Sequence, residues 1–362
     1  QLRSHSIFAL LTVLNTLPML LFSPVAGVFA DRLPRKGIIV SCDLAAASCI
    51  VGVSTLSHYD ALKPSHVVWA CILLSLLRTF SWPASVASMS ALASANMRPR
   101  VNGTAETIEG GITICGPVLG AFLYKTIGLT GVTIVDVASY LACTMIVLTI
   151  PFPVISNEFE RRSDDKSIYA RWIEDCTFGF KWIGKHKDLK HLLLFFLLIN
   201  IGCSIFSVNY APYVLSFASP DVLAIALMLG GVGAVLGGAI FAATGGFRRP
   251  VVGVLFGAIF LGISMVGFGV SRTAGSICCF AFMYGGFFPI MNASSQTIWQ
   301  ARVPIQVQGR VFSIRRMIAW GLCPLFVLLS VPLVELVFGS FLSSQWKFRA
   351  IWGEGLAGTL GL

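Results

Sequence analysis

The sequence predicts an all-α polytopic membrane protein made of two pseudo-symmetric helix bundles, and three observations support this fold class. The 362 residues are 56% hydrophobic and 12% charged, roughly half the charged fraction of a soluble domain. Apolar residues occur in stretches of about 20 or more, the length of a membrane-spanning helix. Basic residues, which produce a net charge of +10, lie in the short gaps between these stretches. The pattern excludes an ordinary soluble enzyme, a disordered chain and a nucleic-acid-binding module.

Ten stretches have the length and hydropathy of membrane spans. They cover residues 7–30, 37–57, 66–95, 105–127, 130–151, 189–217, 221–244, 250–271, 274–300 and 312–339. Residues 351–362 look like the start of another span. Glycine, proline and serine are frequent inside the spans, which is typical of helices that approach one another closely in lipid. Gly233 and Gly237 form one G-x-x-x-G packing motif of this kind.

The basic residues set the expected orientation, because lysine and arginine accumulate in cytoplasmic loops. One set of alternate loops holds 19 of them and the opposite set holds six, while Arg78 lies inside a span. We therefore expect the loops with 19 basic residues to face the cytoplasm. The polar stretch 157–188 belongs to that side and separates an N-terminal bundle, 1–156, from a C-terminal bundle, 189–362. Within it, Ile168, Trp172, Phe180 and Ile183 fit one face of a helix lying on the membrane surface, and a solvated connector is an equal alternative.

The two bundles share a sequence pattern. Trp82-Pro83 is followed by Ala87-Ser88, and Phe288-Pro289 is followed at the same spacing by Ala293-Ser294. A basic loop with Arg-Val follows each pattern. If the halves are repeats, the first lacks its opening helix and the second lacks its last, so the ten spans belong to a twelve-helix protein. The chain begins with Gln1, and we expect it to be a fragment.

Cysteine and histidine give no sign of a bound metal. The ten cysteines lie mostly inside apolar runs without a C-x-x-C pair, and the five histidines are scattered, so no metal-site spacing occurs. No G-x-x-x-x-G-K-S/T loop is present to bind ATP. A membrane-embedded enzyme would need a convergent cluster of acids, histidines or metal ligands, and none is visible in the sequence. We expect no cofactor, no metal and no enzyme activity.

The loop after the first span carries charge at a helix end. Gly27 permits close helix approach, Asp31 can accept hydrogen bonds from a neighbouring helix N-terminus, and the basic residues can exchange partners as helix ends separate. The segment Gly27-Val-Phe-Ala-Asp31-Arg32-Leu-Pro-Arg35-Lys36 resembles the G-x-x-x-D-R-x-G-R-R/K loop of the major facilitator superfamily. Pro34 stands where that family usually has glycine, which changes the turn but not the placement of the charged residues.

Other segments resemble the same superfamily. Gly111, Gly116, Pro117 and Gly120, with Ala121, look like the G-P-x-x-G-G element of its antiporters, in which glycine and proline make a bendable helix; an ordinary packing kink is the alternative. Further stretches resemble its macrolide-efflux and siderophore-exporter branch: Asn15 to Pro18, Asp43, Arg100 to Gly103, Asp136 to Tyr140, Asn292 to Gln296 and Gln308 to Phe312 with Arg315 to Met317. The resemblance implies a secondary exporter whose six-helix bundles rock around a central site.

Charges at membrane depth are functional candidates by default, because they are costly there unless paired or hydrated. Asp43, one to two turns into its span, can exchange a proton with an aqueous cavity or serve as a structural hydrogen-bond partner. Arg78 resembles the arginine with which many superfamily antiporters tune a proton-carrying acid. Its guanidinium stays charged, so it can act on an acid, hold an anionic group or play a structural part. We expect Asp43 and Arg78 to form the proton-coupling pair.

Four further acids are secondary candidates. Asp136 is expected near the outer face, and a structural role fits it better. Glu106 and Glu109 open the fourth span and can cap a helix. Glu335, near the outer end of the tenth span, can reach water.

The sequence thus predicts a monomeric transporter in the bacterial inner membrane that exports a small amphipathic compound, drug-like, macrolide-like or siderophore-like, by proton antiport. Asp31 with Arg35 would form a cytoplasmic latch, and the helix with Gly116 and Pro117 would flex. The partners are the bilayer, the substrate and protons, with no nucleic acid. A lipid or lysophospholipid flippase of the same superfamily and a non-transporting membrane scaffold remain the alternatives.

Overall fold

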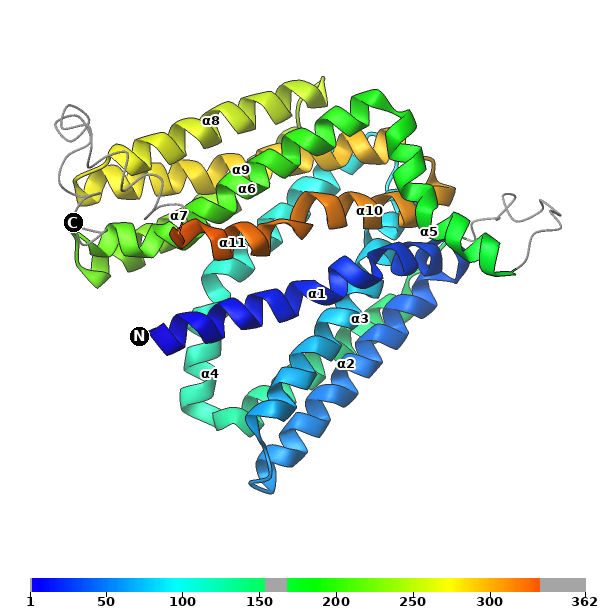
Figure 1. Cartoon of the computed structure of the whole chain (residues 1–362), viewed down its shortest axis with the longest axis horizontal. Coiled ribbons are helices and arrows are strands. Elements are labelled where there is room, and N and C mark those ends of the chain that lie inside the picture. Colours follow the sequence, from blue (N-terminus) through cyan, green and yellow to red (C-terminus); the bar gives the residue numbers. More distant parts are fainter. Residues whose placement is uncertain (1, 154–167, 333–362) are drawn as a thin grey trace. The chain divides into compact units, whose positions relative to one another are not determined.

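The computed structural model describes residues 2–153 and 168–332 of the chain (Figure 1). Glu335, the segment 351–362 and the linker residues 157–167 lie outside the described residues. Within them every regular element is helical. The helices are α1 (Leu2–Arg32), α2 (Arg35–His58), α3 (Pro64–Leu92), α4 (Arg98–Thr149), α5 (Ile168–Lys185), α6 (Lys187–Leu215), α7 (Pro220–Thr244), α8 (Pro250–Val270), α9 (Ala274–Arg302), the 3-10 helix η2 (Ile305–Val307), α10 (Gln308–Gly321) and α11 (Cys323–Pro332).

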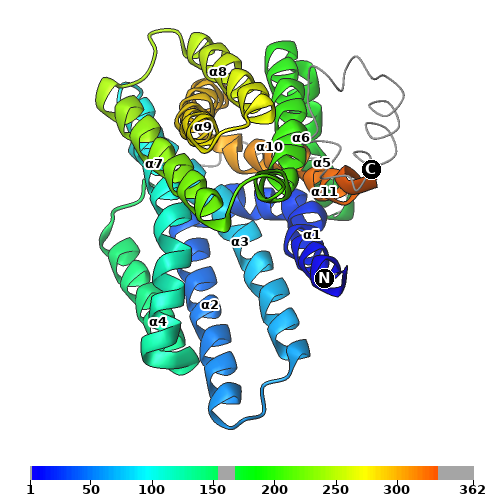
Figure 2. The ribbon, with the colours of Figure 1, turned by 90° about the vertical axis from the view of Figure 1, so that its left-hand side faces the viewer.

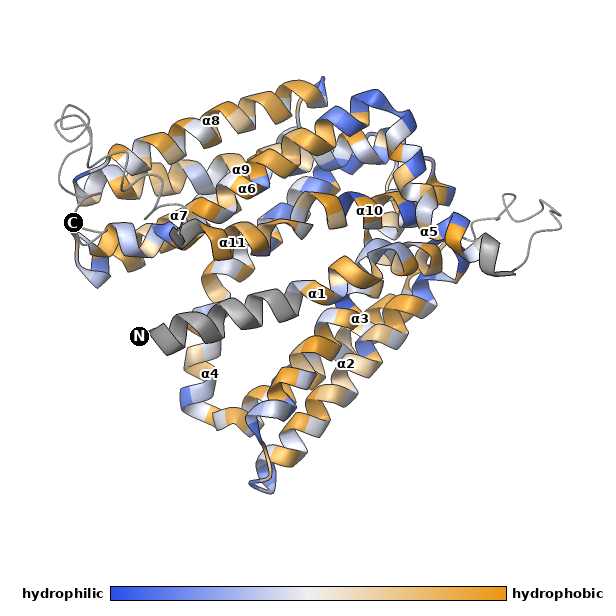
Figure 3. Cartoon of the chain, viewed as in Figure 1, coloured by the Kyte–Doolittle hydropathy of each residue, from blue (hydrophilic) through white to orange (hydrophobic). Residues whose placement is uncertain are grey.

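The helices follow the expected spans. Each of the first three spans coincides with one helix, as do the four spans from 189 to 300, while α10 and α11 cover the described part of the last. Among the described residues, eight helices are long and apolar enough to cross a membrane. Figure 3 shows apolar residues along most of α2, α3 and α8, with polar residues gathered toward helix ends.

One helix, α4, contains two of the expected spans. Its 52 residues are continuous except at Gly128, where φ is +65° and ψ is −175°. Only glycine adopts this conformation readily, so the chain reverses here without a longer loop. The segments before and after Gly128 match the expected spans 105–127 and 130–151.

The chain divides into two compact units. The first comprises residues 1–95, 118–197 and 300–321, and the second comprises 96–117, 198–299 and 322–362. The units are therefore not simply the two sequence halves: residues 96–117 from the first half group with the second unit, and residues 300–321 from the second half group with the first. The division at residues 156 and 189 remains a prediction about the repeat.

The first unit is built around α1 and α3. Helices α1, α2 and α3 pack together, and α10 and α5 cover the carboxyl-terminal part of α1. Figures 1 and 2 both show α2 and α3 side by side. The core joins Ala30, Ile38, Cys42 and Ala84, with Phe29 and other half-buried side chains around them.

The second unit packs its helices through glycine. At Gly233 and Gly237, α7 approaches α9 so closely that an added Cβ would collide with the α9 backbone at Phe282 and Gly286. The packing expected of this motif is therefore confirmed. Another side of α7 meets the first segment of α4, where Gly238 lies against Thr107. Aromatic rings of α6, α8 and α9 fill the remaining core.

Candidate functional site

The Asp31 carboxylate, at the end of α1, binds the N-terminus of α10. Its Oδ1 accepts a hydrogen bond from the Gly309 N–H at 2.7 Å, and its Oδ2 accepts one from the Arg310 N–H at 2.9 Å. These amides belong to the first turn of α10, which has no intrahelical acceptor for them. A carboxylate at this position also interacts favourably with the helix dipole. One acidic side chain, only 2% exposed, thus joins α1 to α10.

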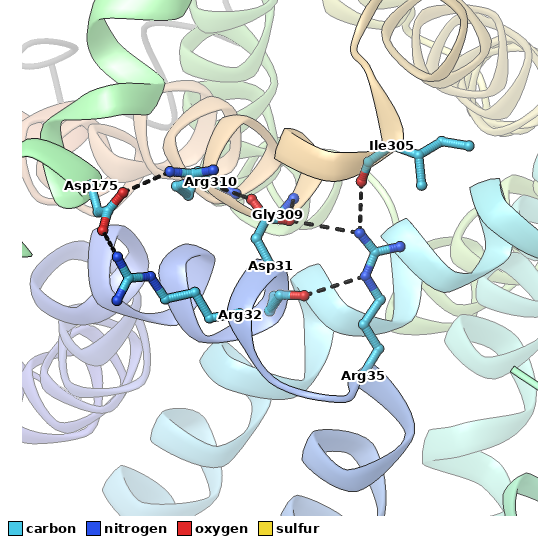
Figure 4. Close-up of polar contacts among 8 residues, drawn as sticks. Asp31, Arg32, Arg35, Asp175, Ile305, Gly309 and Arg310 are labelled. Carbon is cyan, nitrogen blue, oxygen red and sulfur yellow. Dashed lines mark hydrogen bonds and ion pairs between the residues drawn. The ribbon is translucent and has the colours of Figure 1, made fainter. Parts of the chain in front are cut away.

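Two arginines place positive charge around this carboxylate (Figure 4). The Arg310 Nε lies 3.2 Å from Asp31 Oδ2, and an Arg35 terminal nitrogen lies 3.7 Å from Oδ1. Arg35 also donates to three backbone carbonyls, those of Ala30 at 3.3 Å, Ala87 at 3.0 Å and Ile305 at 2.8 Å. The buried Arg35 side chain therefore links α1 and α3 to η2 through backbone carbonyl groups.

The network continues from Arg310 to α5. The second guanidinium nitrogen of Arg310 donates to Asp175 Oδ1 at 2.7 Å, and Asp175 Oδ2 accepts from Arg32. The Arg310 guanidinium lies 4.4 Å from the centre of the Phe178 ring, which is a cation–π distance. We call Asp31, Arg32, Arg35, Asp175 and Arg310 the Asp31 cluster. It joins four helices, α1, α2, α5 and α10, through alternating charges.

Glycines allow the backbones of this cluster to meet. A Cβ at Gly27 would lie 2.8 Å from the Cα of Arg310 and from the carbonyl oxygen of Gly309, and a Cβ at Gly179 of α5 would lie 2.6 Å from the carbonyl oxygen of Arg310. Real Cβ atoms do not come this close to backbone atoms, so larger side chains would separate the helices. The close approach is what brings the Asp31 carboxylate within reach of the amides.

Burial governs the protonation of Asp31, which lies just beyond the expected span 7–30. Removal of the carboxylate from water raises the pKa of Asp31 from its ordinary 3.8 to about 6, although the hydrogen bonds and charge of Arg310 and the charge of Arg35 oppose the shift. Desolvation disfavours the charged form more strongly than its partners favour it. The cluster therefore holds an acid whose protonation changes close to neutral pH.

The last residue of the predicted loop, Lys36, lies apart from this cluster. Its ammonium group donates to the carbonyl oxygens of Leu148 at 2.7 Å and Ile150 at 3.1 Å. Those carbonyls are at the end of α4, where helical acceptors are unsatisfied. Lys36 therefore fixes the start of α2 against the end of α4.

The predicted pair, Asp43 and Arg78, lies in the first unit but outside the Asp31 cluster. Asp43 is half-buried on α2 and accepts a hydrogen bond from the Cys143 thiol of α4. Its other oxygen, Oδ2, is shielded from solvent without a hydrogen-bond partner. Arg78 is exposed on α3. The two residues form no ion pair with each other, and both interact electrostatically with Tyr140 of α4.

The glycines of the expected flexing helix have open surroundings. A Cβ at Gly111 or Gly120 would meet nothing within 4 Å, and at Gly116 it would meet only Ile112 of the same helix at 3.9 Å. The glycines that pack in this part of α4 are instead Gly103, against Ala242, and Gly110, against Ala234. The helix continues through Pro117, and the division between the two compact units falls directly after this residue.

The secondary acids are spread along α4. Glu106 is half-buried and Glu109 exposed in its first segment. Asp136 is half-buried in its second segment, where it interacts with Tyr140.

Comparison with known protein families assigns the fold. The model of the family described as "Major Facilitator Superfamily" matches residues 2–328. The chain belongs to the major facilitator superfamily. The predicted fold class, family resemblance and multi-pass membrane location are thereby confirmed, and the major facilitator assignment makes the chain a transporter rather than an enzyme.

Similar proteins of known sequence and structure agree with that assignment. It is 22% identical to macrolide efflux protein A of Enterococcus faecalis over 84% of the chain and 94% of the relative. It is 22% identical to the multidrug efflux pump Tap of Mycolicibacterium fortuitum over 90% of the chain and 80% of the relative. The crystal structure of the human organic anion transporter MFSD10 has the same fold, with a TM-score of 0.72, 14% identity and coverage of 97% of this chain and 79% of that one.

Sequence reasoning missed three residues of the Asp31 cluster environment. Arg310 was counted among the basic loop residues and lies with Gly309 in the family-like segment Gln308 to Phe312, but neither residue was given a role. Asp175 is one acid within a basic linker, and nothing in its local spacing singles it out. A search for glycine followed by a basic residue at the start of a late helix could have found Gly309 and Arg310, because Asp31 needs free amides as partners.

Proposed function

We propose that this major facilitator protein exports a small amphipathic compound in exchange for protons. The observation that carries the proposal is the Asp43 carboxyl group, whose Oδ2 is shielded inside an apolar helix without a partner. An unpartnered carboxylate oxygen is costly in such surroundings, and protonation removes most of that cost. Asp43 therefore fits a group that takes up a proton in one state and releases it when water reaches it.

The relatives support the direction and the kind of substrate. Curated relatives carry the names macrolide efflux protein A and multidrug efflux pump Tap. Export of amphipathic molecules such as macrolides by this chain is the corresponding proposal. Arg78, close to Tyr140 and exposed on the same unit, would remain charged throughout and would assist proton release from the acids near it.

The Asp31 cluster serves in this proposal as a latch. Its contacts are charge-assisted hydrogen bonds to a helix N-terminus and to arginines. Such contacts can form and break together when helix ends separate. Asp31 and Arg35 keep the roles expected from the sequence, and Arg310 and Asp175 are added to them. The α4 helix would flex near Gly116 and Pro117, since a proline inside a helix removes one backbone hydrogen bond.

Transport in proteoliposomes tests the proposal. A panel of macrolides, other hydrophobic drugs and siderophores is added to vesicles holding a pH gradient, and a pH-sensitive dye reports proton movement. We expect at least one compound to dissipate the gradient with wild-type protein and not with Asp43→Asn. The matched control is Asp60→Asn, because Asp60 is exposed in a turn with φ of +52°, a conformation that asparagine accepts well.

Two results would contradict the proposal. Compound-driven proton movement that persists in Asp43→Asn would remove Asp43 from coupling. Folded wild-type protein that moves no protons with any compound but carries a fluorescent lysophospholipid between leaflets would favour the flippase alternative.

A further inference from the structure

Three side chains on α4 face the same region as Asp43. Asp136, Tyr140 and Cys143 are spaced four and three residues apart, so they occupy one face of the second segment of α4. The Cys143 thiol hydrogen-bonds to Asp43. Tyr140 interacts with Asp43 and also with Asp136. Thr133 of the same face donates a hydrogen bond to Ser54 of α2 at 2.8 Å, so this face of α4 lies against α2. Along it, Tyr140 is positioned between Asp136 and Cys143, the partner of Asp43.

The two carboxyl groups lie at different depths. Asp43 is eight residues from the start of α2, about 12 Å along the helix axis. Asp136 precedes Cys143, the partner of Asp43, by seven residues, about 10 Å along α4 toward its Gly128 end. Tyr140 lies between these positions. The column from Asp43 to Asp136 thus covers the middle of the membrane-spanning helices of this unit.

Other charged and titratable groups near Tyr140 are Arg78 of α3 and Cys49 of α2. In the described part of the chain, no three histidine, cysteine or acidic side chains are arranged to hold a metal ion, so the column is not built as a metal site. Its chemistry, two carboxyl groups separated by a hydroxyl that can both donate and accept, suits the transfer of a proton.

We propose that Asp136 is a second proton-carrying carboxyl group and that Tyr140 connects it to Asp43. The inference rests on the proposed proton antiport. The proton leaves Asp43 Oδ2 and is accepted by the Tyr140 hydroxyl oxygen, while the Tyr140 hydroxyl releases its own proton toward the Asp136 carboxylate. In the state in which water reaches Asp43, water molecules bridge the gaps between these groups. The net change is the transfer of one proton from Asp43 to Asp136, and Tyr140 ends as a neutral hydroxyl group. The sequence analysis expected a structural role for Asp136, and this proposal gives it a role in proton coupling.

The first test compares coupled and uncoupled transport. We measure macrolide-driven proton movement and, separately, macrolide counterflow, which exchanges substrate without net proton transfer. Tyr140→Phe removes only the hydroxyl group, and Tyr124→Phe on the exposed side of α4 is its matched control. We expect Tyr140→Phe and Asp136→Asn to slow proton-coupled transport by about a hundredfold and to leave counterflow unchanged, whereas Tyr124→Phe changes neither. Asp136→Glu should restore part of the coupled rate.

The outcomes separate this inference from the proposed function. If Asp43→Asn abolishes coupling while Tyr140→Phe and Asp136→Asn behave as wild type, the column is wrong and the antiport proposal stands. If counterflow falls in parallel with coupling in Tyr140→Phe, the role is structural and the inference is overturned. If wild-type protein moves no protons with any compound, the proposed function fails instead.

A second measurement needs no substrate. Infrared difference spectra of the purified protein, recorded as the pH is stepped, follow the protonation of individual carboxyl groups. Groups that interact titrate together, so we expect Asp136→Asn and Tyr140→Phe to shift the titration midpoint of the Asp43 band, and Tyr124→Phe to leave it in place. An Asp43 midpoint that is the same in all four proteins would overturn the inference.

Discussion

Asp31 is the residue on which the contacts of its cluster converge. It binds two amides of α10 and two arginines, and burial raises its pKa to about 6. The low local dielectric that strengthens its hydrogen bonds also destabilises its charged form. A single carboxyl group combines a structural contact with sensitivity to pH.

The pKa of Asp31 predicts how stability depends on pH. Because folding raises the pKa from 3.8 to about 6, the folded state binds the proton more tightly. Protonation of Asp31 then contributes stability that is complete below about pH 4 and is lost as the pH rises through about 6, about 3 kcal/mol in total. Asp31→Asn cannot titrate. We expect the unfolding free energy of wild type to fall relative to Asp31→Asn over this range, measured by thermal unfolding in detergent.

Asp60→Asn provides the control for that experiment, because its unfolding free energy should depend on pH in the same way as that of wild type. The prediction would be contradicted if the unfolding free energy of wild type increased relative to that of Asp31→Asn as the pH rises. Such an increase would mean that Arg35 and Arg310 lower the pKa of Asp31 more than burial raises it.

At the scale of elements, α5 contacts both α1 and α10 and holds them together. Asp175 accepts from both Arg32 and Arg310, Phe178 lies under the Arg310 guanidinium, and the Trp172 ring lies 5.9 Å from Phe29. The apolar face expected for a surface helix is only partly free, because Ile183 is buried while Phe180 is exposed. The polar and aromatic contacts of α5 are therefore made with the protein.

Replacing Asp175 should loosen α5. Asp175→Asn weakens two hydrogen bonds to arginine, of which the one to Arg310 is well shielded, and the expected cost is about 1–2 kcal/mol. Hydrogen–deuterium exchange of α5 amides, followed by mass spectrometry, should then be roughly five to thirty times faster. Asp188→Asn, an exposed acid at the start of α6, is the matched control. Unchanged exchange in Asp175→Asn would show that aromatic packing alone holds α5.

Local spacing predicted the helices and three of the five residues of the Asp31 cluster, namely Asp31, Arg32 and Arg35. Hydropathy marks each span, and the spacing from Gly27 to Lys36 identifies a charged helix end. Asp31 and Arg310 are 279 residues apart, and no local pattern states which late helix meets which early one. The same limit applies to α4: its composition predicted a glycine-rich helix, but Gly103 and Gly110 pack whereas Gly116 does not, since packing depends on which face a neighbour covers.

At the scale of the whole molecule, the two compact units use different close contacts. In the first unit, Gly27 and Gly309 let α1 meet α10, and Asp31 adds charge. In the second unit, Gly103 of α4 meets Ala242 of α7, and the sequence after α7 carries no acid before Arg248. The contact in the first unit is therefore sensitive to charge, whereas in the second unit small residues let α4 and α7 approach each other closely.

The orientation of the whole chain follows from its charge distribution and can be measured directly. Lys63 and Lys125 are exposed on the side expected outside, and Lys181 and Lys185 are exposed on the side expected in the cytoplasm. A membrane-impermeant amine reagent should label the first pair in right-side-out vesicles and the second pair in inverted vesicles, with both pairs labelled after permeabilisation. Because basic loops are retained on the cytoplasmic side, labelling of Lys181 only in right-side-out vesicles would reverse the orientation. The Asp31 cluster would then lie on the outer side of the membrane.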